Sequence, residues 1–394
     1  MIKIKSVVGY LLIISLIFAF VCLPIPMDYY EAPVVWYINA NAPIYAFYVS
    51  VLYLFLTILS GRFKYDDITL CLALRCFTCL VPILYIASID SFTAHYPTVL
   101  IALFSYIIAR NSKWCNEHMA SIVLVGFGLI LCYQVIITFL QIPVSYLELS
   151  YKRYMRIPLA ATNVIAAYLV PIFYLFVFNL RPRKVVKITG ILLFIICIIL
   201  TKSRGGITCL LVTYLLYILF LNNKFKKEYK FLIICIIGIV CLLLLQLPEI
   251  QLFLMGFSDP GADANSLTSG RIDIYEAELQ RFLNHPLFGN GMVFNQETSK
   301  TGAHNMIVEL LVQTGLIGII LYFIPIIIVY RHALKYRNTR NMMGWVLFIT
   351  AILIHGMFEL NFFNYSTDIM FWCACGLIIS YSPKMNRALS HRLV

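Results

Sequence analysis

The chain has 394 residues, of which 61% are hydrophobic and only 12% are charged. This composition excludes a water-soluble globular protein and indicates a polytopic membrane protein. Its 30 Lys and Arg outnumber its 18 Asp and Glu, for a formal net charge of +12, which could also suit a nucleic-acid-binding protein. The positions of the basic residues along the chain decide between these two classes.

Apolar stretches near the length of a transmembrane helix recur along the whole chain. We expect about twelve spans, with about ten or eleven as the alternative, because a helical span needs about 20 largely apolar residues. In chain order they centre on residues 6–23, 43–60, 68–88, 94–109, 119–140, 161–178, 185–200, 206–221, 231–247, 313–330, 342–359 and 366–381.

The expected fold class is therefore an all-α polytopic membrane protein. Its expected organisation is transmembrane helices 1–9 in residues 1–247, one large polar loop with short helices in residues 248–312, and transmembrane helices 10–12 with a C-terminal tail in residues 313–394. Charged residues inside the apolar segments are few, notably Arg75 and Glu359.

The basic residues gather in alternate connections between the expected spans. With the N-terminus in the cytoplasm, 21 of the 30 Lys and Arg fall in cytoplasmic segments, and the C-terminus is cytoplasmic too. Opposing loops such as residues 24–33 and 88–96 carry little positive charge. This is the positive-inside pattern of membrane proteins, and it explains the net charge without a nucleic-acid partner.

Some cations break this pattern. Eight fall on the outer side: Lys152, Arg153, Arg156, Lys202, Arg204, Arg271, Arg281 and Lys300. A long loop is translocated whatever its charge, which accounts for Arg281 and Lys300. It does not account for the clusters YKRYMR (151–156) and TKSRGG (201–206). Since ionisable groups near membrane depth are usually functional, we expect an anion site built from these two clusters, which contain Arg153, Arg156 and Arg204.

The polar loop holds two further candidate segments. RIDIYEAELQRFL (271–283) has helical apolar spacing and begins with Arg271, where a cation is disfavoured unless it has an anion to bind. TGAHNMIVELLVQTGLIG (301–318) begins a helix at about Ala303 or His304. Asn305 and Glu309 share one face of this helix, beside His304. A lone histidine near a helix start is more often an ordinary polar terminus than a catalyst, and both interpretations stay open.

Several chemistries find no support in the sequence. No Walker A, HExxH, Gly-x-Ser-x-Gly or Asp-x-Asp motif occurs, so we expect no metal and no cofactor. The adjacent Asp66 and Asp67, beside Arg62 and Lys64, are interpreted as a solvated cytoplasmic loop. The arginines, one histidine and one or two carboxylates of the outer side suit pyrophosphate binding and metal-free group transfer.

Three segments resemble the O-antigen ligase and O-antigen polymerase (Wzy-like) superfamily of bacterial membrane glycosyltransferases. They are the SRG turn at 203–205, the pattern SGR…PLFGxG from Ser269 to Gly291, and HNxxxExxxxxGLIG from His304 to Gly318. The resemblance covers roughly residues 150–360, and the first spans match only in hydropathy. His285 stands where Asn or Glu commonly precedes the Pro-Leu-Phe-Gly run, a minor departure.

The resemblance implies a GT-C-type architecture, a location in the bacterial inner membrane, and an active site on the periplasmic face. It implies an undecaprenyl-pyrophosphate-linked oligosaccharide as donor and no metal. It places Arg204 and Arg271 at the pyrophosphate and His304 at the acceptor hydroxyl, as catalytic residues. Asn305 and Glu309, together with Arg153 and Arg156 on the grounds of their misplaced charge, are expected to bind substrate.

Three functions stay open on the sequence. A polymerase joins lipid-linked repeat units, and this is the favoured interpretation. A ligase moves the finished glycan onto lipid A-core and differs only in its acceptor. A polysaccharide transporter or flippase is less favoured, because the apolar segments carry so few charges and polar chemistry gathers outside them.

Overall fold

The structure is a computed structural model of the chain. It describes residues 48, 51–52, 55, 58–59, 64–86, 89–111, 117–142, 162–221, 271–292, 303–336, 340–359 and 365–381. Arg153 and Arg156 lie outside the described residues, as do the expected spans at 6–23 and 231–247. The described part is helical and contains no strand, so the all-α class is confirmed.

The helices follow the expected apolar segments. In chain order they are α3 (Asp67–Thr78), the 3-10 turn η1 (Val81–Leu84), α4 (Ile89–Asn111), α5 (Glu117–Gln141), α7 (Thr162–Phe178), α8 (Lys184–Leu200), α9 (Arg204–Leu216), the π-helical turn η3 (Tyr217–Leu221), α13 (Arg271–Asn284), α14 (Met306–Lys335), α15 (Arg340–His355) and α16 (Tyr365–Ser380). Among the described residues, four stretches are long and apolar enough to cross a membrane: Asp67–Leu84, His118–Gln141, Arg204–Leu221 and Met306–Lys335. The number of spans and the GT-C architecture remain predictions.

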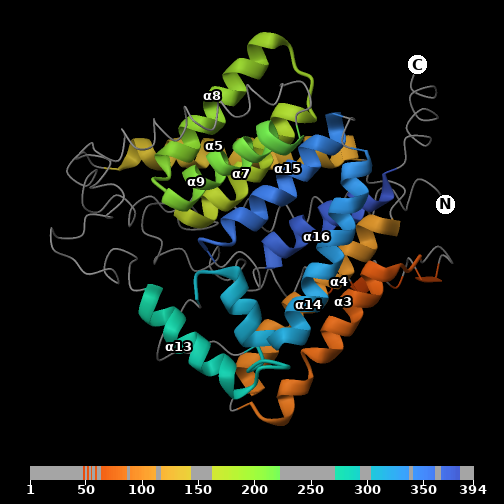
Figure 1. Cartoon of the computed structure of the whole chain (residues 1–394). Coiled ribbons are helices and arrows are strands. Elements are labelled where there is room, and N and C mark those ends of the chain that lie inside the picture. Colours follow the sequence, from red (N-terminus) through yellow and green to blue (C-terminus); the bar gives the residue numbers. More distant parts are fainter. Residues whose placement is uncertain are drawn as a thin grey trace.

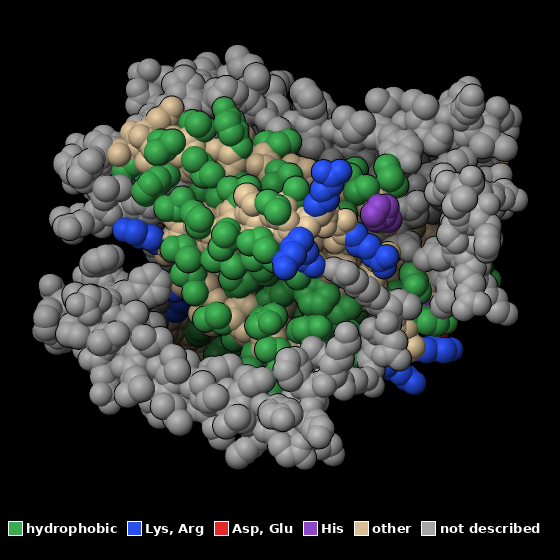
Figure 2. Space-filling model, turned by 90° about the horizontal axis from the view of Figure 1, so that it is seen from above, with side chains coloured by type: hydrophobic (Ala, Val, Ile, Leu, Met, Phe, Trp, Pro, Cys, Tyr) green, Lys and Arg blue, Asp and Glu red, His purple; other side chains and the backbone are tan. Residues whose placement is uncertain are grey.

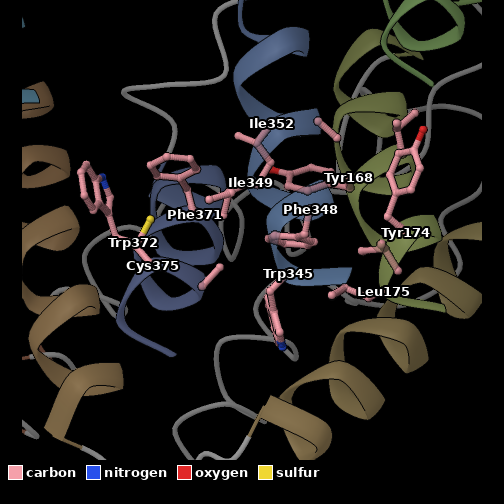
Figure 3. Close-up of a cluster of buried hydrophobic side chains, with 14 of the residues drawn as sticks. Tyr168, Tyr174, Leu175, Trp345, Phe348, Ile349, Ile352, Phe371, Trp372 and Cys375 are labelled. Atoms are coloured by element: carbon pink, nitrogen blue, oxygen red, sulfur yellow. The ribbon is translucent and has the colours of Figure 1, made fainter. Parts of the chain in front are cut away.

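The bundle is held together by three close helix pairs, α4 with α16, α7 with α15, and α3 with α14 (Figure 1). Figure 3 shows the core between α7, α15 and α16, where large side chains are fully buried: Tyr168, Tyr174, Leu175, Trp345, Phe348, Ile349, Ile352, Phe371, Trp372 and Cys375. Between apolar helices in a bilayer, such close packing rather than removal from water drives association.

The outward-facing surfaces are apolar, as expected for helices that meet lipid. On α8 a stripe of exposed side chains recurs at helical spacing: Val185, Leu192, Ile196 and Ile199. Figure 2 shows one face of the molecule, on which hydrophobic side chains cover most of the described surface and Lys and Arg form small groups among them. A protein in water would not expose this much contiguous apolar surface, so the described helices belong to a membrane protein.

Arg75 of α3 is a buried cation inside the bundle. Only 3% of the residue is exposed, and its guanidinium lies 4.8 Å from the centroid of the Tyr322 ring on α14. A cation over an aromatic face is stabilised by the electron-rich ring, which offsets part of the cost of desolvation. The contact ties α3 to α14.

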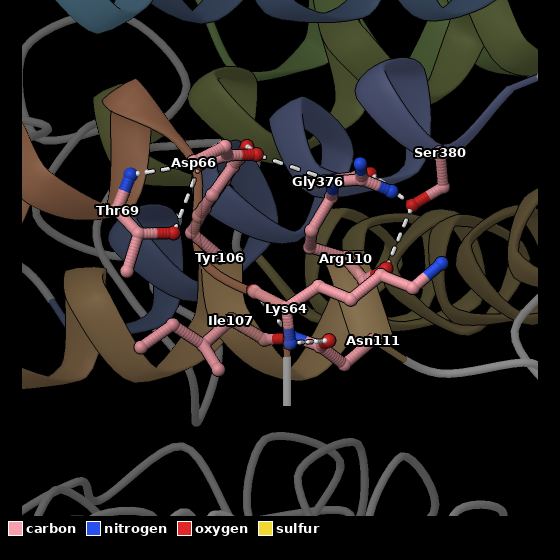
Figure 4. A network of polar contacts seen from close by, with 9 residues as sticks. All are labelled: Lys64, Asp66, Thr69, Tyr106, Ile107, Arg110, Asn111, Gly376 and Ser380. Atoms are coloured by element: carbon pink, nitrogen blue, oxygen red, sulfur yellow. Dashed lines mark hydrogen bonds and ion pairs between the residues drawn. The ribbon is translucent and has the colours of Figure 1, made fainter. Parts of the chain in front are cut away.

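A polar network closes one end of α3, α4 and α16 (Figure 4). Asp66 is the N-cap of α3 and accepts hydrogen bonds from the Thr69 N–H at 2.9 Å, the Thr69 hydroxyl at 2.9 Å, Tyr106 at 2.7 Å and Arg110 Nε at 3.2 Å. Burial alone would raise the pKa of Asp66, but these hydrogen bonds outweigh it and lower the pKa. The interpretation of Asp66 as a solvated loop residue is therefore wrong, whereas Asp67 is exposed.

α14 is broken at Gly315, where the backbone has φ 67° and ψ −172°. The break separates a short segment, 306–314, from the apolar segment 316–335, and Figure 1 shows the two at an angle. It also removes the helical hydrogen bonds that would join residues 316 and 317 to residues 312 and 313.

The loop 286–291 replaces the missing hydrogen bonds at this break. Its N–H groups donate to the freed carbonyls, and its carbonyls accept from the freed N–H groups: Asn290 N to Val312 O at 2.7 Å, Gly291 N to Gln313 O at 3.1 Å, Leu316 N to Pro286 O at 2.9 Å, and Ile317 N to Leu287 O at 3.1 Å. A Cβ on Gly315 would lie 2.3 Å from the Leu287 carbonyl oxygen, and one on Gly289 would lie 2.4 Å from the Gln313 carbonyl carbon. The PLFGNG and GLIG motifs are thus two halves of one backbone junction.

Candidate functional site

A cavity of about 400 Å³ lies where α7, α9, α13 and the turn after α15 meet. Its lining is contributed by four parts of the chain: Asn163 from α7, Arg204, Gly205 and Thr208 from α9, Arg271, Ile272 and Tyr275 from α13, and Met357, Phe358 and Glu359 from the turn. The cavity therefore brings together the two arginines that the sequence placed at a pyrophosphate.

Arg204 lines the cavity and is the first residue of α9. Ser203 is the N-cap, and its hydroxyl accepts a hydrogen bond from the Gly206 N–H at 3.1 Å. A Cβ on Gly206 would come within 2.5 Å of the Ala166 Cβ, so this glycine lets α9 lie close against α7. Gly205 lines the cavity itself. The SRGG turn thus supplies a helix N-terminus, a guanidinium and close helix packing at one point.

Arg271 is the first residue of α13, and its Nη2 lies 3.5 Å from Glu359 Oε1. Arg204 and Arg271 lie near enough for their positive charges to repel one another. Two guanidinium groups beside a single carboxylate leave a net positive charge on the described lining. Such a lining attracts anions, and paired guanidinium groups match phosphate geometry well.

His304 joins the site through Glu359. Its Nδ1 lies 3.0 Å from Glu359 Oε2, although His304 is not among the described residues that line the cavity. Burial alone would raise the pKa of Glu359, but the hydrogen bond to His304 and the charges of His304 and Arg271 outweigh it and lower the pKa. A carboxylate can only accept, so His304 Nδ1 carries the proton and Nε2 keeps its lone pair when the ring is neutral.

Backbone and side-chain contacts hold this pair in place. The Met306 N–H donates to the Gly356 carbonyl at 2.7 Å, and Asn305 Nδ2 donates to the Met357 carbonyl at 3.2 Å. Asn163 Nδ2 donates to Glu359 Oε1, leaving Oε2 for His304.

His304 has φ 51°, an uncommon value for a residue other than glycine. Strained backbone of this kind is typical of functional sites.

Asn305 and Glu309 lie beside the pair rather than in the cavity lining. Asn305 is the N-cap of α14, and its side chain accepts from the N–H groups of Ile307 and Val308. Glu309 is buried, with 2% of the residue exposed, and its Oε2 accepts from the Ala303 N–H at 2.7 Å. Both contacts fix the backbone on either side of His304, and the expectation that Asn305 and Glu309 bind substrate stays a prediction.

Two site residues were missed by sequence reasoning. Glu359 was noted only as a charge inside an apolar segment, whereas α15 ends at His355 and Glu359 lies in the turn beyond it. A carboxylate at an apolar boundary was itself the available signal. Asn163 is the second residue of the largely apolar helix α7, and nothing in the sequence distinguishes it. Among the described residues, no group of three or more His, Cys, Asp or Glu could hold a metal ion.

Part of the chain matches a known protein family. Residues 189–323 match the family model described as O-antigen ligase (Wzy_C). The match covers about a third of the chain, and residues 189–323 are called the Wzy_C domain below. The resemblance inferred from the sequence is thereby confirmed, and members of this family are membrane glycosyltransferase-like enzymes. No curated protein matches the chain.

The Wzy_C domain accounts for only part of the site. It contains Arg204, Arg271 and His304, whereas Asn163 and Glu359 lie outside its bounds. Helix α7 and the turn after α15 flank the domain in sequence and complete the cavity. The site is therefore assembled from the Wzy_C domain and its two neighbouring segments.

Proposed function

We propose that the protein is a polysaccharide polymerase of the membrane. It transfers an undecaprenyl-pyrophosphate-linked glycan onto the acceptor sugar of another lipid-linked repeat unit, without a metal. The observation that carries this proposal is the convergence of two arginines and Glu359 on one cavity, with His304 hydrogen-bonded to Glu359. This reaction needs cations that stabilise the diphosphate leaving group and a base that accepts the proton of the acceptor hydroxyl.

The reaction exchanges one bond for another at the anomeric carbon of the donor. The acceptor hydroxyl oxygen forms a bond to this carbon, and the bond from the carbon to the pyrophosphate oxygen breaks. The hydroxyl proton passes to His304 Nε2, and the bonding electron pair leaves with the pyrophosphate. Glu359 keeps the proton on Nδ1 and stabilises the imidazolium that forms.

Arg204 and Arg271 stabilise the charge that develops on the leaving pyrophosphate. The Arg271–Glu359 contact of 3.5 Å is long for a charge-assisted hydrogen bond. Arg271 can therefore turn from the carboxylate to an incoming phosphate oxygen at little cost. Arg153 and Arg156, outside the described residues, are proposed to extend this anion site.

The distribution of basic residues supports a periplasmic site. With both termini in the cytoplasm, α9 would begin on the outer side, and the cavity at its N-terminus would face the periplasm. A donor that is exposed on the outer leaflet of the inner membrane would reach this cavity from the bilayer.

A ligase is the second candidate, and the description of the matched family favours it. It would use the same donor chemistry with lipid A-core as acceptor. Deletion of the gene separates the two candidates. Loss of a polymerase leaves lipopolysaccharide capped with a single repeat unit, which is the result we expect. A bare core together with carrier-linked polymer would instead establish the ligase.

A transporter is tested on the purified protein. We expect the protein to form glycosidic bonds between lipid-linked repeat units in proteoliposomes. Binding of the lipid-linked glycan without formation or cleavage of any glycosidic bond would contradict an enzyme and support transport.

A further inference from the structure

Helix α13 has an exposed apolar face beside an exposed polar face. Four exposed apolar side chains follow one side of the helix and the residues just beyond it: Ile272, Leu279, Leu283 and Leu287. The adjacent face repeats the same spacing with exposed polar residues: Asp273, Gln280 and Asn284. Glu278, on the far side, is buried where α13 packs against α14. The helix is thus amphipathic in a way that its contact with α14 does not explain.

The C-terminal end of α13 is fixed at the end of a candidate membrane span. His285 stacks on Tyr85 with ring centroids 4.0 Å apart, and the Tyr85 hydroxyl donates to the Gly289 carbonyl at 2.7 Å. Tyr85 directly follows the apolar stretch Asp67–Leu84, which is long enough to cross a membrane. This end of α13 therefore lies at the level where that stretch leaves the bilayer.

The N-terminal end of α13 is fixed at the start of another candidate span. Arg271, Ile272 and Tyr275 line the same cavity as Arg204, which is the first residue of the apolar stretch Arg204–Leu221. Both ends of α13 thus lie near the ends of candidate spans, as expected for a helix that runs along the membrane boundary. In the view of Figure 1, α13 runs across the direction of α3 and α15.

We propose that α13 is an interfacial helix whose apolar face rests on the acyl chains of the leaflet on the cavity side. The occupant of this face is lipid rather than another protein, because the neighbouring surface on η1 is also apolar and exposed, with Leu84 86% and Ile83 41% accessible. Amphipathic helices with such faces lie in the membrane interface. Glu276, exposed at the edge of the stripe, is within reach of the headgroups.

This placement gives α13 a role at the site. It holds Arg271 at headgroup depth, where the phosphate of a lipid-borne substrate lies, so that such a substrate meets the cavity without leaving the bilayer. The interfacial placement itself is independent of the proposed reaction, because it rests only on exposure, on spacing and on the two fixed ends of the helix.

Photo-crosslinking in lipid nanodiscs tests the proposal on the full chain. The photoreactive residue p-benzoyl-phenylalanine is introduced singly at Leu279 and Leu283, with Gln280 and Asn284 as matched controls on the polar face. All four side chains are exposed, so the fold should tolerate the probe, and monodisperse elution on size exclusion verifies this. Mass spectrometry then measures the phospholipid adduct at each position.

We expect phospholipid adducts at 279 and 283 that exceed those at 280 and 284 at least tenfold. Equal adducts on both faces, or no lipid adduct at 279 and 283, would overturn the proposal. Crosslinks from 279 and 283 to another segment of the chain, or to a second copy, would also overturn it, because the face would then be covered by protein.

Discussion

The His304–Glu359 contact fixes which nitrogen of the histidine can act as a base. Glu359 accepts from Nδ1 over 3.0 Å, so in the neutral ring Nε2 is the nitrogen that carries the lone pair. The lowered pKa of Glu359 means that this carboxyl stays ionised throughout the neutral range. The proposed reaction uses the pair as a base and an orienting anion, as in other catalytic histidine dyads.

Glu359→Gln tests this division of roles. The amide keeps the shape but loses the charge that stabilises the imidazolium, so kcat should fall by about 10²- to 10⁴-fold, the usual contribution of general acid–base catalysis. Steady-state kinetics measures the loss, and full kcat in the Glu359→Gln variant would contradict the role.

Arg271→Lys tests whether a planar guanidinium is needed. Lys keeps the charge but loses the fork of donors, so kcat should fall by about 10- to 100-fold, as expected when a charged hydrogen bond of about 1.5–3 kcal/mol is lost. Arg281→Lys is the matched control, since Arg281 belongs to the same helix, pairs with Glu278 at 2.6 Å and does not line the described cavity. Equal losses in both variants would point to a general effect on α13.

At the scale of elements, the junction between the 286–291 loop and the break in α14 ties α13 to α14. Arg271 begins α13 and His304 lies just before α14, so the junction links the two helices that follow these residues. Rigid support of this kind keeps catalytic groups within the narrow geometry that transfer reactions need.

Gly315→Ala should disrupt the junction. The new Cβ would lie 2.3 Å from the Leu287 carbonyl oxygen, and φ 67° is itself strained for alanine. We expect a lower melting temperature in detergent, from a cost of about 1–3 kcal/mol or more, together with loss of turnover. Gly126→Ala in α5 is the matched control, because its Cβ meets nothing within 4 Å. That variant should be as stable as the parent or more so by up to about 1 kcal/mol. A Gly315→Ala protein as stable as the Gly126→Ala protein would contradict the junction.

Asp66→Ala should destabilise the N-terminal end of α3. It removes the N-cap of this helix and leaves Tyr106 and Arg110 without the Asp66 carboxylate as acceptor. Loss of an N-cap costs about 0.5–2 kcal/mol. The lowered pKa of Asp66 means that its contribution is present above the ordinary value of 3.8 and is lost as pH falls through the lower folded value. The difference in melting temperature should thus stay constant from pH 8 to 5 and shrink only below about pH 4. The exposed Asp67→Asn is the control, and a difference that already fades at pH 6 would contradict the assignment.

The elements also show where sequence reasoning works and where it does not. Hydropathy located the described apolar helices. Arg204 and Arg271 drew attention because they fall on the expected outer side, against the positive-inside pattern. The break at Gly315 could not be predicted, because it sits in an apolar run that reads as one helix and depends on a loop 25 residues upstream. Asp66 was misread for a similar reason, since its partners Tyr106 and Arg110 lie far along the chain.

At the scale of the molecule, the site exists only because distant segments converge. Arg204, Arg271 and His304 come from the Wzy_C domain, and Asn163 and Glu359 come from segments before and after it. Sequence motifs therefore revealed Arg204, Arg271 and His304, which belong to the family pattern. The rest of the site, contributed by α7 and the turn after α15, required the packed bundle.

The central claim is that His304 is the base of a glycosyl transfer that proceeds at the arginine-lined cavity. The most direct test is single-turnover transfer by His304→Ala in proteoliposomes with purified lipid-linked repeat units, alongside donor binding. The account predicts a rate about 10²- to 10⁴-fold below that of the parent protein, with donor binding retained, because the base acts in the transition state and not in the ground state. Transfer by His304→Ala at the parent rate would contradict it.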